Sequence, residues 1–94
     1  MVPIHPGRIL NRELTARNLS ANRLALALRV PSGRITDILN GKRSISPETA
    51  LRLAHFFGTS AEFWVNLQAR YDLAVTEKEM GAKIAAEVKR AMND

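Results

Sequence analysis

The stretch LSANRLALALRVPSGRITDILNGKR, residues 19–43, predicts two short helices joined by a tight turn. Ser20 can cap the first helix, because its hydroxyl accepts a hydrogen bond from a backbone N–H of the first turn. Pro31 ends that helix, since proline has no N–H to donate and restricts the residue before it. Asn40-Gly41 ends the second helix, because glycine takes left-handed backbone angles at little cost. Two helices of about eight residues around a turn of about four match helix-turn-helix spacing.

Both helices of this stretch have an apolar face. The spacing of the apolar residues places them on one side of each helix, directed into a core. They are Leu24, Ala25 and Leu28 on the first helix and Ile35, Ile38 and Leu39 on the second. Ser32 follows Pro31 directly, so we expect it to cap the second helix.

The side chains left exposed on the second helix are small or polar and lie near its N-terminus. In a helix-turn-helix, the second helix enters the major groove of DNA, and its N-terminal side chains meet base edges. Arginine can bond guanine at two atoms, aspartate can accept from cytosine, and threonine can offer its methyl group to thymine. Lys42 and Arg43 follow the helix, and we expect them beside phosphates, which fix position but carry no sequence information. The predicted base-reading residues are Ser32, Gly33, Arg34, Thr36 and Asp37.

An ordinary helical hairpin with a solvated charged face is the alternative interpretation, and the charge distribution favours DNA over it. Residues 1–71 contain ten Lys and Arg against four Asp and Glu, a net charge of +6. Residues 72–94 contain four Lys and Arg against five Asp and Glu, a net charge of −1. Nine of the ten cations in the first segment are Arg, which suits forked contacts with phosphate and guanine. An anionic partner is therefore expected for the segment that carries the helix-turn-helix.

Length and composition narrow the class of protein. The 94 residues suit one small domain. The chain has no cysteine, which excludes disulfides and thiolate metal sites. It has no apolar run near the roughly twenty residues that a membrane helix needs. Its first residues, MVPIHPGR, lack the apolar stretch of a signal peptide. We therefore expect a cytoplasmic protein with no membrane partner.

Helix signals on both sides of the central stretch predict an all-α fold. A first helix is expected to start at Pro6, where a missing N–H matters least. Ser46-Pro47-Glu48 starts a fourth helix, which Gly58 ends. Thr59-Ser60-Ala61-Glu62 is a capping box that opens a fifth helix. With no alternating strand pattern, we predict a compact five-helix, repressor-like helix-turn-helix domain over residues 5–72.

The remaining segment, residues 73–94, is expected to be a helical extension with its own C-terminal helix. Thr76-Glu77-Lys78-Glu79 forms a second capping box. The helix could lie on its own domain or dock on a partner chain, and its residues leave both options open. Its thin apolar stripe consists of Met80, Ile84, Val88, Ala91 and Met92.

An aromatic-rich stripe on the fifth helix is the predicted dimer interface. Trp64, Leu67 and Tyr71 share one face at helical spacing. Aromatic residues with an apolar body and a polar tip are enriched at interfaces. One short recognition helix cannot specify a long site, so we expect a two-fold homodimer with recognition helices about 34 Å apart. In the competing interpretation, Trp64 fills the core of the monomer.

The residues of the chain do not combine into a catalytic site. His5 and His55 are far apart in sequence; we expect His5 to cap the first helix and His55 to lie on a helix surface. No Gly-rich phosphate loop, metal-ligand spacing or nucleophile–base pattern is present. We therefore predict that the protein is not an enzyme and uses neither a cofactor nor a metal.

The helix-turn-helix stretch resembles the repressor/Cro type, and a wider pattern is more specific. HPGRIL at residues 5–10, LNGKR at 39–43 and SPETALRLAHFFGTSAEFWVNLQARYDL at 46–73 are together similar to the HigA family of antitoxins. The resemblance covers nearly all of residues 5–75. It implies a small all-α homodimer that binds a palindromic DNA operator and represses its own operon. It also implies a protein partner, a HigB-type toxin that cleaves messenger RNA.

The resemblance carries DNA-binding positions onto this chain residue by residue. The base-reading positions are the five already named. Two departures stand out: Ala21 occupies a place where many relatives have a phosphate-binding Gln, and Arg29 occupies a turn position that is usually Gly. A left-handed Arg29 would cost on the order of 1 kcal/mol. Gly33 offers no side chain, so specificity is expected to rest on Arg34, Asp37 and DNA shape. The phosphate-binding positions implied are Asn22, Arg23, Asn40, Lys42 and Arg43.

A stand-alone repressor, of phage or housekeeping type and without a toxin partner, is the alternative function. The residues do not distinguish it from an antitoxin. A small ribonuclease-like reading frame beside this one would favour the antitoxin.

Overall fold

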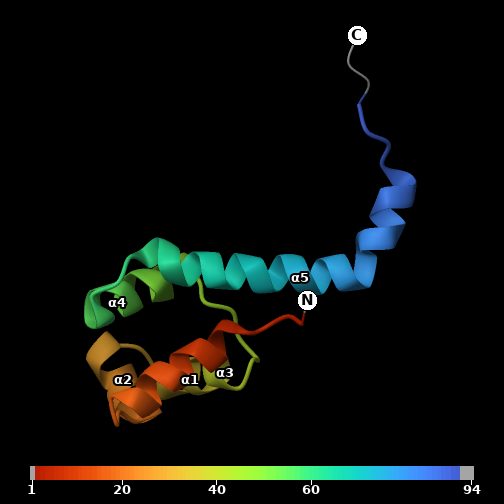
Figure 1. Ribbon diagram of the computed structural model, residues 1–94. Coiled ribbons are helices and arrows are strands. Elements are labelled where there is room, and N and C mark those ends of the chain that lie inside the picture. Colours follow the sequence, from red (N-terminus) through yellow and green to blue (C-terminus); the bar gives the residue numbers. More distant parts are fainter. Residues whose placement is uncertain (1, 92–94) are drawn as a thin grey trace.

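The computed structural model describes residues 2–91, which form five α-helices and no strand (Figure 1). The predicted all-α, five-helix fold is thus confirmed. The helices are α1 (Pro6–Ala16), α2 (Ala21–Leu28), α3 (Ser32–Leu39), α4 (Pro47–Phe57) and α5 (Ala61–Glu87).

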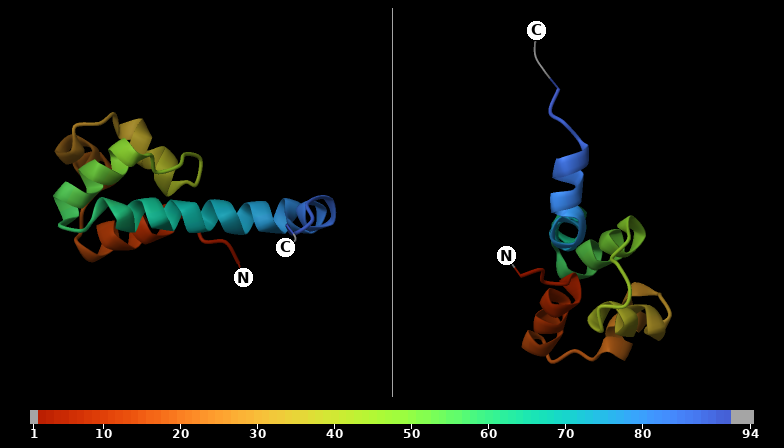
Figure 2. Two further views of the ribbon diagram at one scale, coloured as in Figure 1. Left: turned by 90° about the horizontal axis from the view of Figure 1, so that it is seen from above. Right: turned by 90° about the vertical axis from the view of Figure 1, so that its right-hand side faces the viewer.

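The first part of α5 covers the rest of the helices on one side. It packs on α4 and α1, whereas α2 packs on α3 and α4, and α3 packs on α1. The α2–α3 pair therefore lies on the far side of the domain from α5, as the end-on view of α5 in Figure 2 shows. The core between them is formed by Leu10, Leu14, Leu24, Ala25, Leu28, Ile35, Ile38, Ile45, Ala50, Leu53 and Trp64.

Side-chain caps start four of the five helices. The sequence predicts those at His5, Ser20 and Ser46, whereas its capping box places the start of the fifth helix at Thr59, one residue before the observed cap Ser60. The serine hydroxyls of Ser20, Ser46 and Ser60 each accept from the backbone N–H three residues later. His5 caps α1, because its Nδ1 accepts from the N–H of Gly7 at 2.9 Å. The expectation for Ser32 is wrong. Pro31 is the N-cap residue of α3, and its extended backbone, without a side-chain bond, starts the helix.

The first four helices end in the same way, with one residue in the left-handed conformation. These residues are Asn18, Arg29, Gly41 and Gly58, with φ between 53° and 74°. At each end, the next residue's N–H donates to the carbonyl five residues back, for example Lys42 to Asp37 at 2.8 Å. This is the Schellman motif, which satisfies carbonyls that the helix leaves without a partner. Because the motif ends each helix sharply, α2 and α3 are short and pack together as a compact pair.

A glycine allows the backbones of α1 and α3 to approach each other. Gly7, in the first turn of α1, faces the carbonyl of Ile38, and a Cβ atom at this position would overlap that oxygen. Only a residue without a side chain fits here. The contact fixes how closely α1 packs on α3.

A buried glutamine joins the loop after α3 to α5. Gln68 is 6% exposed; its Oε1 accepts from the N–H of Ile45 at 2.8 Å. Its Nε2 donates to Asp72 Oδ1 at 3.0 Å. Both ends of the amide are thus satisfied, as a buried polar group requires.

The expected break between the fifth helix and a C-terminal helix is absent, since α5 runs from Ala61 to Glu87 without interruption. The stretch Leu73-Ala74-Val75 contains neither Gly nor Pro. Thr76 therefore lies inside a helix, where a capping-box sequence caps nothing. The helix bends toward its C-terminal end and leads away from the domain (Figure 1). Met92, the last member of the predicted stripe, lies outside the described residues.

Candidate nucleic-acid interface

The turn between α2 and α3 is tight because Arg29 is left-handed, with φ 61° and ψ 43°. Arg29 therefore carries the steric cost of a left-handed residue other than glycine, on the order of 1 kcal/mol. The N–H of Val30 donates to the carbonyl of Ala25 at 3.0 Å and closes the turn. Pro31 then directs the chain into α3. Only two residues therefore separate the left-handed residue from the first residue of the recognition helix.

The five predicted base-reading residues share the outer side of α3. Ser32, Gly33 and Thr36 are exposed, whereas Arg34 and Asp37 are half-buried. Ile35 and Ile38, which alternate with them, are fully buried in the core. The α3 helix thus presents a polar face outward from its first residue, as a reading helix requires.

Two of these side chains have an intramolecular partner. The hydroxyl of Thr36 donates to the carbonyl of Ser32 at 3.2 Å. Because the hydroxyl already has a partner, the methyl group is the part of Thr36 that could contact a thymine methyl. Arg34 Nη1 lies 3.4 Å from Glu48 Oε1, and the Arg34 side chain is 23% exposed. Arg34, the most versatile of the predicted base-reading side chains, is therefore held against the protein.

All five predicted phosphate-binding residues are exposed, and they lie at two places beside α3. Asn22 and Arg23 are in the first turn of α2. Asn40, Lys42 and Arg43 lie at and after the C-terminal end of α3. The three cations form no ion pair with any residue in the range 2–91. Groups that can bind phosphate thus stand in the first turn of α2 and directly after α3.

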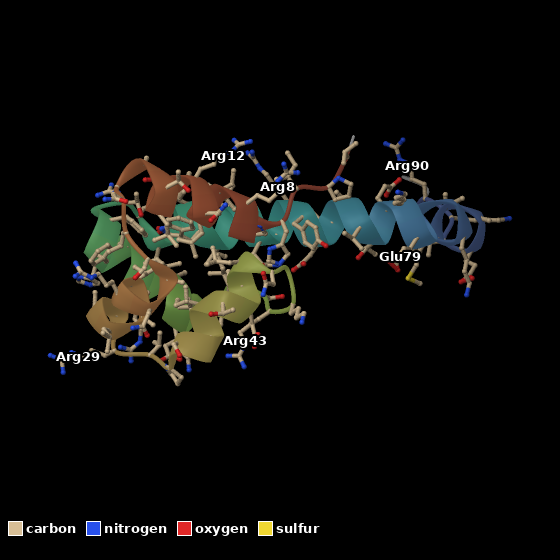
Figure 3. The ribbon with its side chains drawn as sticks, turned by 90° about the horizontal axis from the view of Figure 1, so that it is seen from below. Arg8, Arg12, Arg29, Arg43, Glu79 and Arg90 are labelled. Carbon is tan, nitrogen blue, oxygen red and sulfur yellow. The ribbon has the colours of Figure 1, made fainter. Side chains whose placement is uncertain are left out.

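The cations of the chain are spread over more than one face. In Figure 3, Arg29 and Arg43 lie on the side of α2 and α3, and Arg8 and Arg12 lie on α1 at the opposite edge. The excess positive charge of residues 1–71 is therefore not gathered in a single surface patch. The α2–α3 side combines cations with a polar helix face, and it is the candidate nucleic-acid interface.

The structure separates the three residues predicted to form the dimer interface. Trp64 is 1% exposed, and its Nε1 donates to Thr59 Oγ1 at 2.9 Å. Trp64 therefore fills the monomer core, and its assignment to a surface seam is wrong. Leu67 is partly buried against the same core. The Tyr71 ring packs edge-on against the His5 ring, with centroids 4.9 Å apart. This stripe faces inward because α1 and α4 cover it.

Sequence reasoning missed two residues near the interface, Glu48 and Arg52. Glu48 Oε2 lies 3.1 Å from Arg52 Nη2, and Arg52 Nη1 donates to the Leu28 carbonyl at 2.9 Å. The i,i+4 spacing of Glu48 and Arg52 could have indicated their pairing. The contact from Glu48 to Arg34 spans fourteen residues of sequence and required the fold.

The two histidines lie where the sequence predicts them. His55 is exposed on α4. Burial lowers the pKa of His5 below its ordinary value of 6.5, and the nearby negative charge of Asp72 opposes this shift. Neither lies in a cluster of three or more His, Cys, Asp or Glu that could hold a metal ion, and residues 2–91 contain no such cluster. A helix with the length and hydropathy of a membrane span is also absent from residues 2–91.

The turn geometry and the polar face of α3 define a helix-turn-helix protein. A family model described as helix-turn-helix matches residues 10–64. Among curated proteins, the chain is 46% identical over 80 residues to virulence-associated protein I of Dichelobacter nodosus, covering 84% of this chain and 74% of that protein. It is 32% identical over 72 residues to antitoxin HigA-1 of Vibrio cholerae, covering 76% and 68%.

Solved structures are similar over nearly the whole chain. An addiction module antidote protein of the HigA family from Coxiella burnetii superposes with a TM-score of 0.94 at 54% identity, covering 97% of this chain and 100% of that one. Pseudomonas aeruginosa antitoxin HigA, solved with the higBA promoter, has a TM-score of 0.94 at 41% identity and the same coverage. This chain belongs to the HigA family of antitoxins.

Proposed function

We propose that this chain is a DNA-binding antitoxin that represses its own operon as a homodimer and neutralises a HigB-type toxin. The observation that carries the DNA-binding part is the outward polar face of α3, with exposed cations in the first turn of α2 and directly after α3. Similarity to an antitoxin solved with its promoter supports the same role. Since α2 and α3 lie on the far side from α5, the proposed reading face is open in the monomer.

The proposed division of labour on DNA assigns sequence reading to Arg34, Asp37 and the Thr36 methyl group. Lys42 and Arg43 contact phosphates after the helix, and Asn22 and Arg23 contact them before it. Gly33 faces open space, since no atom lies within 4 Å of a Cβ placed there. Because it has no side chain, the backbone of α3 can come close to the groove at this position. Sequence-dependent DNA shape then contributes to specificity.

Two arginine variants test this division. The preferred duplex is first selected from a random pool with the wild-type protein. Arg34→Ala is expected to cost about 1–3 kcal/mol on that duplex and to relax preference at one or two base pairs. Arg43→Ala is expected to weaken binding to all sequences and to lower the salt dependence by about one charge. Isotherms on selected and scrambled duplexes at several salt concentrations measure both.

Arg12→Ala is the matched control, since Arg12 lies on α1 at the opposite edge from Arg43 (Figure 3). It should leave affinity and preference unchanged. Identical behaviour of the Arg34 and Arg43 variants would overturn the assigned orientation of α3. Selection that yields no preferred duplex would overturn the proposed DNA-binding function itself.

We propose the dimer seam on the exposed apolar side chains of the N-terminal arm and α5, extending from half-buried Leu67 and Tyr71. Val2, Pro3, Leu73 and Ala74 line a groove of about 910 Å³ between the arm and α5. Leu73 is 71% exposed, and Val2 is 81% exposed. A second copy would cover these apolar groups, whose burial stabilises association.

Oligomeric state tests the seam. Leu73→Glu is expected to convert a micromolar dimer to a monomer without loss of helical signal, because Leu73 contributes little to the monomer core. Leu26→Glu is the control, since Leu26 is 67% exposed on α2, far from the groove. Sedimentation velocity measures both variants. A Leu73→Glu variant that stays fully dimeric would exclude this seam.

Neutralisation of a toxin needs a separate test. Co-expression with the product of a neighbouring ribonuclease-like gene should restore growth that the toxin alone arrests, and the two proteins should co-purify. A stand-alone repressor is the second candidate, because the chain is also 40% identical over 79 residues to YbaQ of Escherichia coli, an uncharacterized HTH-type transcriptional regulator. Absence of any toxin-like neighbour, with intact operator binding, would favour this second function.

A further inference from the structure

A series of charged contacts connects α3, the proposed recognition helix, to the C-terminal end of α2. Arg34 Nη1, on α3, lies 3.4 Å from Glu48 Oε1, on α4. Arg52 Nε donates to the other oxygen of Glu48 at 3.1 Å. Arg52 Nη1 donates to the Leu28 carbonyl at 2.9 Å. The base-reading Arg34 is thus connected through two side chains to the backbone at the C-terminal end of α2.

Glu48, in the middle of this series of contacts, lies in the first turn of α4, and its side chain is 58% exposed. Glu48 is the second residue of α4, directly after Pro47, and the Ser46 hydroxyl caps the helix by accepting from Thr49. A negative side chain in the first turn is favoured by the helix dipole, but the dipole does not select a side-chain direction. Arg52, one turn later on α4, sets the direction of the Glu48 side chain, because its guanidinium forms an ion pair with the Glu48 carboxylate. Glu48 therefore presents one oxygen toward α3 in a defined place.

Arg34 is the residue that gains from this arrangement. Its side chain is 23% exposed, compared with 48% for Arg17 in its ion pair with Glu13. A long arginine side chain has many rotamers in solution, and binding that requires one of them loses that freedom. A partner that restricts Arg34 in the unbound protein removes part of this cost before DNA arrives. Such restriction favours the base whose position matches the held guanidinium.

We propose that Glu48 is a positioning residue that orients Arg34 for base reading, and that Arg52 acts through Glu48. The proposal deepens the proposed function and rests on Arg34 as a base reader. It predicts opposite effects on two quantities. The Glu48 carboxylate repels nearby phosphates and lowers affinity for DNA of any sequence. It raises the ratio of affinities for the preferred and scrambled duplexes, because it aims Arg34.

A role as an ordinary surface charge predicts a different result. Removing such a charge would raise affinity for every duplex by the same factor, and the ratio would stay constant. That increase would also occur whether or not Arg34 were present. The ratio, and its dependence on Arg34, therefore distinguish positioning from simple repulsion.

The experiment is a double-mutant cycle on the full chain, with Glu48→Ala, Arg34→Ala and the combined variant. We expect Glu48→Ala to raise affinity for scrambled DNA and to lower the preferred-to-scrambled ratio about two- to fivefold, the range of an exposed ion pair. In the Arg34→Ala background, the ratio should not change further. Arg52→Ala should lower the ratio in the same direction. Isotherms at one fixed salt concentration give all values.

Glu62→Ala is the matched control. Glu62 occupies the same second position of α5 after a serine cap, and it forms no ion pair with any residue that the structure describes. It should leave the ratio unchanged. A Glu48→Ala variant with an unchanged or increased ratio would overturn the proposal, as would a fall that persists without Arg34. Thermal melting of each variant checks that the fold is intact.

A measurement without DNA keeps the two proposals separable. Nitrogen-15 relaxation of the Arg34 Nε–H group should show restricted motion in the wild-type protein and faster motion in Glu48→Ala. Equal mobility in both proteins would overturn the positioning role. Restricted motion in the wild type, together with no preference for any duplex, would overturn the proposed DNA-reading function while Glu48 still holds Arg34.

Discussion

The two parts of α5 have the same backbone conformation but different surroundings. In residues 61–72, Trp64 and Gln68 are buried against α1 and α4. In residues 73–87, no side chain is buried, although Leu73, Met80 and Ile84 are apolar. The apolar spacing in the two parts is similar, so helical periodicity alone does not decide burial. Other helices pack on the first part of α5 and do not reach the second.

This difference predicts two kinds of stability in one helix. The first part unfolds only with the core, because its buried side chains belong to that core. The second part depends on the helix propensity of its own residues unless another surface covers it. Paired substitutions, one in each part of the chain, can therefore break or sharpen the comparison.

The largest difference is expected for large-to-small substitutions. Trp64→Ala should lower the free energy of unfolding by about 3–5 kcal/mol, because it empties a core position and removes the bond to Thr59. Leu73→Ala should change it by less than about 0.5 kcal/mol in the monomer, since Leu73 is exposed. Urea unfolding followed by circular dichroism, at concentrations low enough for monomers, measures both. Equal losses would show that the two parts unfold as one unit.

A glycine-to-alanine pair gives the next largest difference. Gly7→Ala should destabilise by about 1–3 kcal/mol or more, because the new methyl group meets the Ile38 carbonyl and separates α1 from α3. Gly81→Ala meets only the flexible end of the Glu77 side chain. It should raise helicity at little cost in stability, since alanine favours helix by up to about 1 kcal/mol. Melting curves and the helical signal at low temperature test both variants. An unchanged Gly7→Ala variant would contradict the close approach.

A smaller effect is expected at the turn of the helix-turn-helix. Arg29→Gly should raise the free energy of unfolding by up to about 1 kcal/mol, because Arg29 has a left-handed conformation that glycine adopts without steric cost. Part of this gain is offset by the greater freedom of glycine in the unfolded chain. Arg29→Lys is the control, since it keeps the side-chain charge and the strain. A less stable Arg29→Gly variant would show that the arginine side chain contributes more than the strain costs.

The smallest expected effect is a pH dependence from His5. The pKa of His5 in the folded protein is lowered below 6.5 by burial, so the unfolded chain takes up a proton first as the pH falls. Stability contributed by neutral His5 is complete above about pH 6.5 and is lost as the pH falls toward the folded pKa. His5→Asn retains a helix cap and does not titrate. Its unfolding midpoint should fall less than that of the wild type between about pH 7.5 and pH 5.5.

The sequence predicted features that depend on neighbours along the chain. The caps at His5, Ser20 and Ser46 each follow from residues a few positions apart, and the structure confirms them. The sequence did not predict the features that depend on residues far apart in the chain. The inward direction of Trp64 depends on α1 and α4, which cover it. The Thr76 capping box was misleading because a local signal cannot end a helix whose preceding residues also favour helix.

The candidate site divides in the same way. Exposure of Ser32 and Thr36 on the outer side of α3 followed from helical spacing, because the alternating residues are apolar. The contact between Arg34 and Glu48 did not, since it joins two helices across fourteen residues. The three-dimensional structure was needed to show which exposed polar side chains are held by a neighbouring helix.

The hydrogen bond from Ile45 to Gln68 has a consequence for amide hydrogen exchange. Ile45 lies in a loop, where amide protons ordinarily exchange within seconds to minutes, yet its N–H donates to a buried acceptor on α5. Its exchange rate therefore reports how often the first part of α5 lifts from the domain. A single resonance in the loop thus gives the opening free energy of the helix that covers the core.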